Sequence, residues 1–259
     1  MRSTQSHAKL IVADTSRADS FVAVVGSCNW LSTPYRRVEA SVVLRDGRLV
    51  GQILRGMSEM CFATIRQARL VGELDQWGRY AERCRREEGH AEVRLVLGDE
   101  HGVMMRHARD TAGASIWVGA DRFGQAAEVR TLIPMMAAGR EGVAGRVLFS
   151  RSVGRLTEED MADLEMEAKQ SNVALWAVPE GVLHGKFLLW DDDDAIITSL
   201  NWSSAATRPD NPWGEMGVHL SLPGLASGLR GRLETSLQVA HDAKVEYREQ
   251  RDRRRRLRG

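Results

Sequence analysis

The sequence predicts an α/β fold in which two related repeats pack as a pseudo-twofold pair around mixed, largely parallel central sheets. The first observation is an internal repeat: residues 7–14 read HAKLIVAD and residues 184–191 read HGKFLLWD, so both have the pattern H-x-K-x-x-x-x-D. Self-similarity of this kind indicates a repeated structural unit. The second observation is that strand-like and helical patterns alternate between residues 101 and 179, which is typical of α/β domains.

Each motif begins a short series of strand-like runs. The runs VAVVGSCNW at 22–30 and AIITSLNW at 195–202 follow the motifs, and both end in a Ser-x-Asn-Trp turn. A glutamate then precedes another apolar run in each repeat, Glu39 before ASVVL and Glu215 before MGVHL. Because apolar, β-branched runs bounded by small polar residues are typical of strands, we expect three strands in each repeat.

A complete α/β unit precedes the second motif. The segment after Leu156 reads Thr-Glu-Glu-Asp, which resembles a capping box with acidic residues in the first helical turn. Met161, Leu164 and Ala168 then share one face of the helix. Taken in order, the patterns predict a helix at 101–112, a strand at 114–120, a helix at 125–139, a strand at 143–150, a helix from Thr157 and a strand at 172–179.

The first repeat is shorter than the second. Counted from Ala91, 93 residues precede His184, whereas six precede His7, so the first repeat lacks about 87 residues of the unit. We expect a longer chain, a start further upstream or another protomer to supply them, because the sheet would otherwise have an uncovered edge or face. The predicted domains are the C-terminal half of the first repeat with a mainly helical connection (1–90), the complete second repeat (91–243) and a basic tail (244–259).

Composition excludes several classes of protein. The chain has 259 residues, of which 43% are apolar, and a formal net charge of +1 that combines a tail of +5 with a body of −4. It has no apolar run near the roughly 20 residues that span a bilayer, and no apolar leader. Three cysteines at unrelated spacings predict neither a disulfide framework nor a zinc site, which indicates a reducing, cytoplasmic location.

The motif residues suit chemistry on phosphodiesters. A histidine and a lysine two residues apart on a strand point to the same face. Imidazole can attack phosphorus or transfer a proton near neutral pH, and an ammonium can stabilise the non-bridging oxygens. A carboxylate such as Glu39 or Glu215 can bind the far ring nitrogen of its histidine and fix the tautomer. Two motifs at one site would provide one histidine to attack and one to protonate the leaving group.

Lysine is rare in this chain, which makes the motif lysines informative. Of 36 basic residues only four are lysine, and two of these, Lys9 and Lys186, lie in the motifs. Arginine is a planar fork, whereas lysine is a compact point charge that can approach a phosphoryl group end-on. The motifs therefore contain a residue type that is rare in this chain and whose compact positive charge suits contact with a phosphoryl group.

These motifs resemble the paired signature of the phospholipase D superfamily, HxKx4D followed by a Gly-Ser-x-x-Asn-like turn. The resemblance covers both motifs, their turns, the following glutamates and the α/β unit ahead of the second motif. It implies a metal-independent phosphodiesterase without a cofactor, which forms a covalent phosphohistidine at one site between the repeats. The sequence departs from the family pattern at Thr198, where the family usually has glycine.

The resemblance also implies a role for each motif residue. One histidine would be the nucleophile and the other the general acid, and the family favours the N-terminal histidine as nucleophile. The residues concerned are His7 and His184 for these two roles, Lys9, Lys186, Asn29 and Asn201 for binding phosphate with Ser27 and Ser199 nearby, Glu39 and Glu215 for orienting the histidines, and Asp14 and Asp191 for tying the motif strands to their neighbours.

The substrate class has three alternatives. A nuclease is favoured by the cytoplasmic character, the paired Asn-Trp turns and the arginine-rich tail, and Trp30 or Trp202 would stack a base unless it belongs to the core. A phospholipase or phosphatidyltransferase would need apolar surface for lipid, and no amphipathic lipid-binding segment is evident. A catalytically inactive nucleic-acid-binding module is the third alternative.

Overall fold

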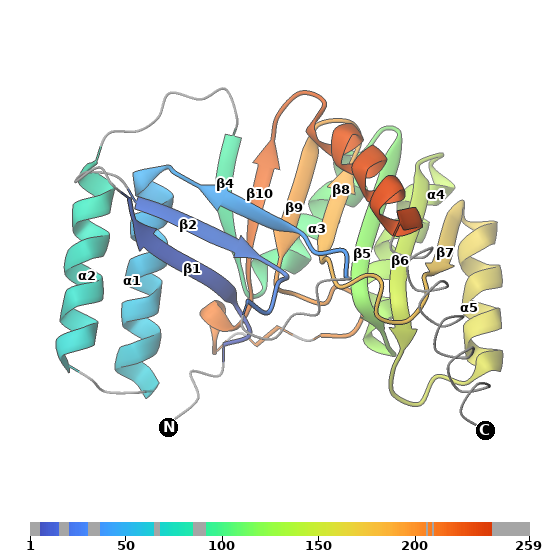
Figure 1. The fold of residues 1–259 in the computed structure, drawn as a ribbon. Coiled ribbons are helices and arrows are strands. Elements are labelled where there is room, and N and C mark those ends of the chain that lie inside the picture. The colour runs from blue at the N-terminus through green and yellow to red at the C-terminus, as the bar shows by residue number, and fades with distance from the viewer. Residues whose placement is uncertain are drawn as a thin grey trace, which may run out of the picture.

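The computed structural model describes residues 6–15, 21–30, 37–64, 68–84, 92–205, 207–208 and 210–239 of the chain. These residues form a seven-stranded sheet, a three-stranded sheet that crosses one of its ends, and helices around both (Figure 1). The predicted basic tail, residues 244–259, lies outside the described residues. Among the described helices, none has both the length and the apolar character needed to cross a membrane.

The elements follow the predicted order. The sequence patterns predict neither β4 at residues 92–97 nor the last helix at residues 225–239, and β5 continues past its expected end at residue 120. The elements are β1 (Lys9–Asp14), β2 (Phe21–Gly26), β3 (Ser41–Leu44), α1 (Gly47–Thr64), α2 (Ala68–Arg83), β4 (Glu92–Leu97), α3 (Glu100–Thr111), β5 (Ser115–Phe123), a π-helical turn (Glu128–Leu132), α4 (Ile133–Arg140), β6 (Ala144–Ser152), α5 (Glu158–Gln170), β7 (Val173–Ala177), β8 (Phe187–Trp190), β9 (Asp194–Thr198), a 3-10 turn (Pro212–Gly214) and β10 (Met216–Ser221).

The seven-stranded sheet is mixed, as predicted. Its strand order is β4-β10-β9-β8-β5-β6-β7, and only the pairs β5–β6 and β6–β7 are parallel. Strands β8 and β10 run opposite to the other five, because the second motif forms the hairpin β8–β9 and β10 returns beside it. The expectation of a largely parallel sheet is therefore correct for strand direction but wrong for strand pairing, in which antiparallel neighbours dominate.

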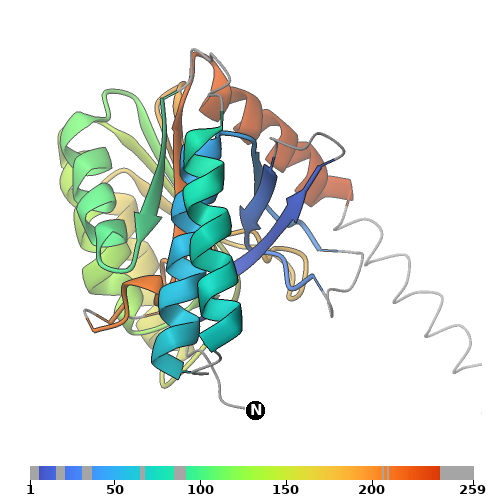
Figure 2. The same cartoon turned by 90° about the vertical axis from the view of Figure 1, so that its left-hand side faces the viewer.

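Three apolar cores join the layers. The first lies between the seven-stranded sheet and α3, α4 and α5. The second lies between the three-stranded sheet, α1, and strands β4 and β10, and the third lies under the helix at 225–239. Viewed along the sheet, α3 covers one face, and the three-stranded sheet and the last helix cover the other (Figure 2). The α1–α2 pair closes the end between the two sheets, so both repeats share one packed body.

One face of the three-stranded sheet is apolar and open. Ile11 lies opposite Val24, which lies opposite Val43, and Ile11 and Val43 are 43% and 57% exposed. Strand β1 pairs only with β2 among the described residues. The described residues before β4 also contain no counterparts of β5, β6 and β7, in keeping with the unequal lengths of the repeats.

The end of the second motif is fixed by a carboxylate. Asp191 has a φ of 46° and accepts hydrogen bonds from the backbone N–H groups of Gly113, Ala114 and Ser115 at 2.9, 2.8 and 3.1 Å. Burial opposes its ionisation, but these N–H groups outweigh burial and lower the pKa of Asp191. Its counterpart Asp14 ends β1, where its backbone pairs with Phe21, and its carboxylate accepts no hydrogen bond within the part of the chain that the structure describes.

The first prediction concerns this carboxylate. Asp191→Ala removes an acceptor shared by three backbone N–H groups, so we expect the free energy of unfolding to fall by about 1–3 kcal/mol in urea denaturation at pH 7. The loss should shrink as pH falls through the lowered folded-state pKa, because the protonated carboxyl no longer stabilises the native state. Asp14→Ala is the matched control and should change stability by less than about 0.5 kcal/mol. Equal losses in the two variants would contradict this assignment.

Candidate active site

The two histidine motifs meet where the three-stranded sheet crosses the seven-stranded sheet (Figure 1). Backbone hydrogen bonds join the repeats at this point. His7 N–H donates to Gly214 O at 2.7 Å, and His184 N–H donates to Val38 O at 2.9 Å. Gly214 and Val38 each precede a glutamate, so these equivalent bonds bring each glutamate beside the histidine of the opposite repeat.

Each histidine is bound by a carboxylate from the other repeat. His184 Nδ1 lies 2.8 Å from Glu39 Oε1, and His7 Nδ1 lies 3.1 Å from Glu215 Oε1. A carboxylate accepts the proton of Nδ1, which leaves Nε2 of each ring as the atom facing the site. The sequence places a glutamate after each motif, but its spacing does not reveal that the pairing crosses between repeats.

The predicted phosphate-binding serines contact the glutamates. Ser27 Oγ donates to Glu39 Oε2 at 2.6 Å, and Ser199 Oγ donates to Glu215 Oε2. Burial alone would raise the pKa of both glutamates, but hydrogen bonds from the histidines and serines outweigh it and lower the pKa values. Each hydroxyl has a single proton, so both serines in this structure position a carboxylate and present no proton to the site.

The lysines lie beside the reactive face of the histidines. Lys9 Nζ lies 2.9 Å from His7 Nε2, and Lys186 Nζ lies 3.3 Å from His184 Nε2. Each also donates to the backbone oxygen of its histidine at 2.9 Å. Burial lowers the pKa of both lysines, and it lowers the pKa of Lys186 to about 8 because this side chain is fully buried and close to the charge of Lys9.

The site is open on the side of the first motif. The side chain of His7 is 55% exposed, whereas that of His184 is 9% exposed. The two motifs thus have the same contacts but different access to solvent. A large substrate can approach the His7 side, while His184 is held in a more desolvated position.

The two predicted asparagines occupy different environments. Asn201 is 9% exposed, and its Oδ1 accepts the Asp121 N–H at 3.0 Å. Asn29 is exposed at the open side. The tryptophans that follow also differ: Trp202 is 3% exposed within the first core, so it is not placed to stack a base, whereas Trp30 is 40% exposed.

A buried histidine supports the second turn. His101 Nδ1 donates to Gly98 O at 2.8 Å, which leaves Nε2 to accept the hydroxyl proton of Thr198 at 2.7 Å. Thr198 Oγ1 in turn accepts the Leu200 N–H at 3.0 Å. Burial lowers the pKa of His101 and favours its neutral form. The residue that departs from the family pattern therefore anchors the turn carrying Ser199, which the sequence alone did not indicate.

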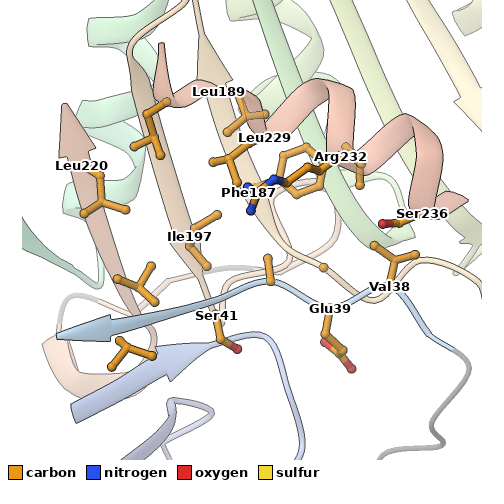
Figure 3. Close-up of a pocket in the computed structure, with 16 residues that line it drawn as sticks. Val38, Glu39, Ser41, Phe187, Leu189, Ile197, Leu220, Leu229, Arg232 and Ser236 are labelled. Carbon is orange, nitrogen blue, oxygen red and sulfur yellow. The ribbon is translucent and has the colours of Figure 1, made fainter. Parts of the chain in front are cut away.

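An apolar cavity of about 430 Å³ lies behind the site, between β3 and the helix at 225–239 (Figure 3). Phe187, Leu189 and Leu229 contribute to its wall. Val38 and Glu39 point to opposite sides of the segment that leads into β3, so the cavity and the histidine site share one stretch of backbone (Figure 3). The described residues contain no group of three or more His, Cys, Asp or Glu side chains able to hold a metal ion.

Comparison with a solved phosphatidylserine synthase supports the fold, and two further solved structures are similar at lower TM-scores. No protein-family model matches the sequence, and no curated protein does either. Phosphatidylserine synthase from Haemophilus influenzae Rd KW20 matches with a TM-score of 0.50 and 10% identity over 86% of this chain and 61% of its own. Nuc, a phospholipase D family member from Salmonella typhimurium, matches with a TM-score of 0.43 and 19% identity over 57% of this chain and 95% of its own. NucT from Helicobacter pylori covers 57% of this chain and 97% of its own, with a TM-score of 0.45 and 11% identity.

The second prediction concerns pH. If the charged form of Lys186 stabilises a phosphoryl group, as the sequence predicts, kcat/KM should fall above pH 8, near the lowered pKa of this lysine, with a slope of one proton. Bound phosphate should favour the charged form, so kcat should hold to higher pH than kcat/KM. Initial rates between pH 6 and 10 test this. A kcat/KM profile that stays level up to about pH 10 would contradict the role of the buried lysine.

The third prediction concerns the crossed glutamates. Glu39→Gln should lower kcat at least a hundredfold, because the amide gives no negative charge to support a protonated His184. In ¹⁵N NMR spectra the same variant should alter the Nδ1–H signal of His184 and leave that of His7 in place. Glu215→Gln is the matched variant and should give the reverse pattern. If each glutamate altered the histidine of its own repeat, the crossed arrangement would be wrong.

Proposed function

We propose that this chain, which has the fold of the phospholipase D superfamily, is a phosphodiesterase that acts through a covalent phosphohistidine without a metal or cofactor, most simply as a nuclease. The observation that carries this proposal is the pair of equivalent His-Lys-Glu sets, joined across the repeats. Two imidazoles with both Nε2 atoms facing two ammoniums supply a nucleophile, an acid and charge stabilisation for a phosphoryl group.

The reaction would proceed in two displacements. His7 Nε2 bonds to phosphorus while the bond to the leaving oxygen breaks, and protonated His184 transfers its Nε2 proton to that oxygen. Neutral His184 then takes a proton from water, the water oxygen bonds to phosphorus, and the phosphorus–nitrogen bond to His7 breaks. Lys9 and Lys186 stabilise the non-bridging oxygens, with Asn29 and Asn201 as neutral donors.

The serines act through the glutamates in this scheme. By donating to Glu39 and Glu215, Ser27 and Ser199 hold carboxylates that stabilise whichever imidazole is protonated. Exposure favours His7 as the nucleophile, because the substrate reaches it from the open side. Asp14 and Asp191 remain outside the reaction as strand-end residues.

A nucleic-acid substrate is supported by surface features of the chain. Trp30, which follows Asn29 in the turn of the first motif, is 40% exposed, and all but four of the 36 basic residues of the chain are arginine. The basic tail at 244–259 would add further phosphate contacts, and the absence of a disulfide pattern from the sequence supports action in the cytoplasm. The complete sets of contacts around both histidines favour catalysis over an inactive nucleic-acid-binding module.

A phospholipid is the second candidate substrate. The apolar cavity beside Glu39 favours it, since an acyl chain needs an apolar wall near the phosphodiester.

The open apolar face around Ile11 and Val43 concerns the partners of the chain and not its substrate. It supports the expectation that a longer chain or another protomer covers the three-stranded sheet, because exposed sheet faces of this kind are usually packed.

The fourth prediction tests the reaction and its substrate together. The protein is offered labelled single-stranded DNA, double-stranded DNA, RNA and phosphatidylcholine in EDTA. Cleavage of nucleic acid should persist without divalent metal, and His7→Asn and His184→Asn should each lower it at least a thousandfold while preserving binding. His107→Asn, at an exposed position on α3, is the matched control and should retain activity.

Trapping resolves the roles of the two histidines. Rapid quenching at alkaline pH should recover an acid-labile phosphohistidine from the wild type and from His184→Asn, but none from His7→Asn. Strict dependence on added metal would overturn the mechanism. Turnover of phosphatidylcholine alone would replace the nuclease by a phospholipase, and label recovered from His7→Asn would reverse the histidine roles.

A further inference from the structure

Two arginines stand side by side at the carboxyl ends of β5 and β6. Arg122 and Arg151 are direct partners in the parallel ladder, so their side chains leave the same face of the sheet. Like charges directly opposite one another on neighbouring strands are unfavourable. The carboxyl ends of parallel strands are also where open α/β sheets commonly bind ligands. This pair therefore lies in a place that suits an anion.

A single carboxylate holds both guanidinium groups. Asp121 Oδ2 lies 3.3 Å from Arg151 Nη2 and 3.4 Å from Arg122 Nε. Its side chain is 9% exposed, whereas the arginine side chains are 40% and 50% exposed. One negative charge thus fixes two positive charges, and the cluster keeps a net positive charge that faces solvent.

The arginines have donors to spare. Arg151 Nε is buried and has no hydrogen-bond partner among the described residues. A buried donor without an acceptor is unfavourable, but Nε is closed to solvent, so the donors that a ligand can reach belong to the exposed parts of the two side chains, which are 40% exposed in Arg151 and 50% exposed in Arg122. Phosphate oxygens fit such a site, because a guanidinium fork binds them through two parallel hydrogen bonds.

The cluster adjoins the histidine site. The Asp121 N–H donates to Asn201 Oδ1 at 3.0 Å, and Asn201 lies in the turn of the second motif. Asp121 is also one of the charges that act on buried Lys186. A ligand held by the arginines would therefore be a direct neighbour of a phosphodiester held by Lys186 and Asn201.

We propose that Arg122 and Arg151 form a subsite for a second phosphate group of the substrate, next to the phosphodiester that is cleaved. The inference rests on the proposed function and narrows its substrate class to diesters that carry a neighbouring phosphate, as a polynucleotide does. Asp121 is a positioning residue in this subsite, because it holds both guanidinium groups in one orientation. A phosphodiester without a neighbouring phosphate, such as phosphatidylcholine, leaves the subsite empty.

The test compares two oligonucleotides that differ in this one respect. The dinucleotide TpT has a single phosphodiester, and the trinucleotide TpTpT has a second phosphate beside each diester. In the wild type kcat/KM should be higher for TpTpT. In Arg122→Gln/Arg151→Gln the ratio of kcat/KM for TpTpT to that for TpT should fall at least tenfold, because a charge-assisted phosphate contact is lost. The salt dependence of kcat/KM for TpTpT should weaken as well.

Two further variants separate binding from folding. Arg122→Lys/Arg151→Lys keeps the charge beside Asp121 but loses the planar fork, so it should fold normally and lower the ratio by a smaller factor. Arg146→Gln removes another arginine of β6, one that pairs with Glu234 and stacks on Trp117, and should leave the ratio unchanged. Thermal unfolding of each variant accompanies the rate measurements.

The outcomes are distinct. An unchanged ratio in both double variants, or an equal loss on TpT and TpTpT, would show that the arginines serve only the fold and would overturn the subsite. If the wild type cleaves neither oligonucleotide, the proposed function fails instead. In that case, the binding of fluorescent TpTpT and TpT tests the subsite. A loss of affinity for TpTpT but not for TpT in the double variants supports the subsite, and double variants that bind both oligonucleotides as tightly as the wild type does would overturn it.

Discussion

The crossed contacts between Glu39 and His184, and between Glu215 and His7, are the interactions on which the rest of the structure depends. They hold two distant segments of the chain together, and they place the two histidines of the proposed reaction at one site. The neighbouring backbone bonds, from His7 to Gly214 and from His184 to Val38, hold the repeats in the register that these contacts require. The three-stranded sheet is thereby fixed across the end of the larger sheet, and neither repeat has a complete histidine site without the other.

The same contacts determine which side chains are charged in the partly buried site around the two histidines. Two glutamates with lowered pKa values face two lysines with lowered pKa values, so the charges of these four side chains compensate one another. A phosphodiester adds one negative charge, which a single protonated imidazole offsets. Acid catalysis by one histidine and attack by the other neutral histidine therefore agree with the electrostatic balance of the pocket. The serines contribute by fixing the carboxylates, since hydrogen bonds are what keep buried glutamates ionised here.

The pseudo-twofold arrangement is not fully symmetric, and the differences concern access and surroundings. His7 lies on an open side and His184 on a closed one, next to Asp121 and the turn that His101 supports through Thr198. An apolar cavity lies behind Glu39, and a positively charged cluster of two arginines lies beyond Asn201. The two histidine motifs would thus provide the same reaction in any substrate, and the cavity and the arginine cluster, which have no equivalent among the described residues by the other histidine, would select the substrate.

The sequence by itself determined the repeat, the order of the strands and helices apart from β4 and the last helix, and the residue types of the candidate site. Short-range patterns are sufficient for this, because strand and helix periodicities and the HxKx4D spacing are local. Only the tertiary structure decided which glutamate serves which histidine, that the serines bind carboxylates, that Trp202 is a core residue, and that Asp121, Arg122 and His101 adjoin the site. These facts depend on strand pairing between distant segments and on burial. The prediction of mainly parallel strand pairing was wrong for the same reason. A strand that returns through a hairpin and a strand that follows a crossover helix have similar local sequence patterns, so only the assembled sheet shows which neighbours are antiparallel.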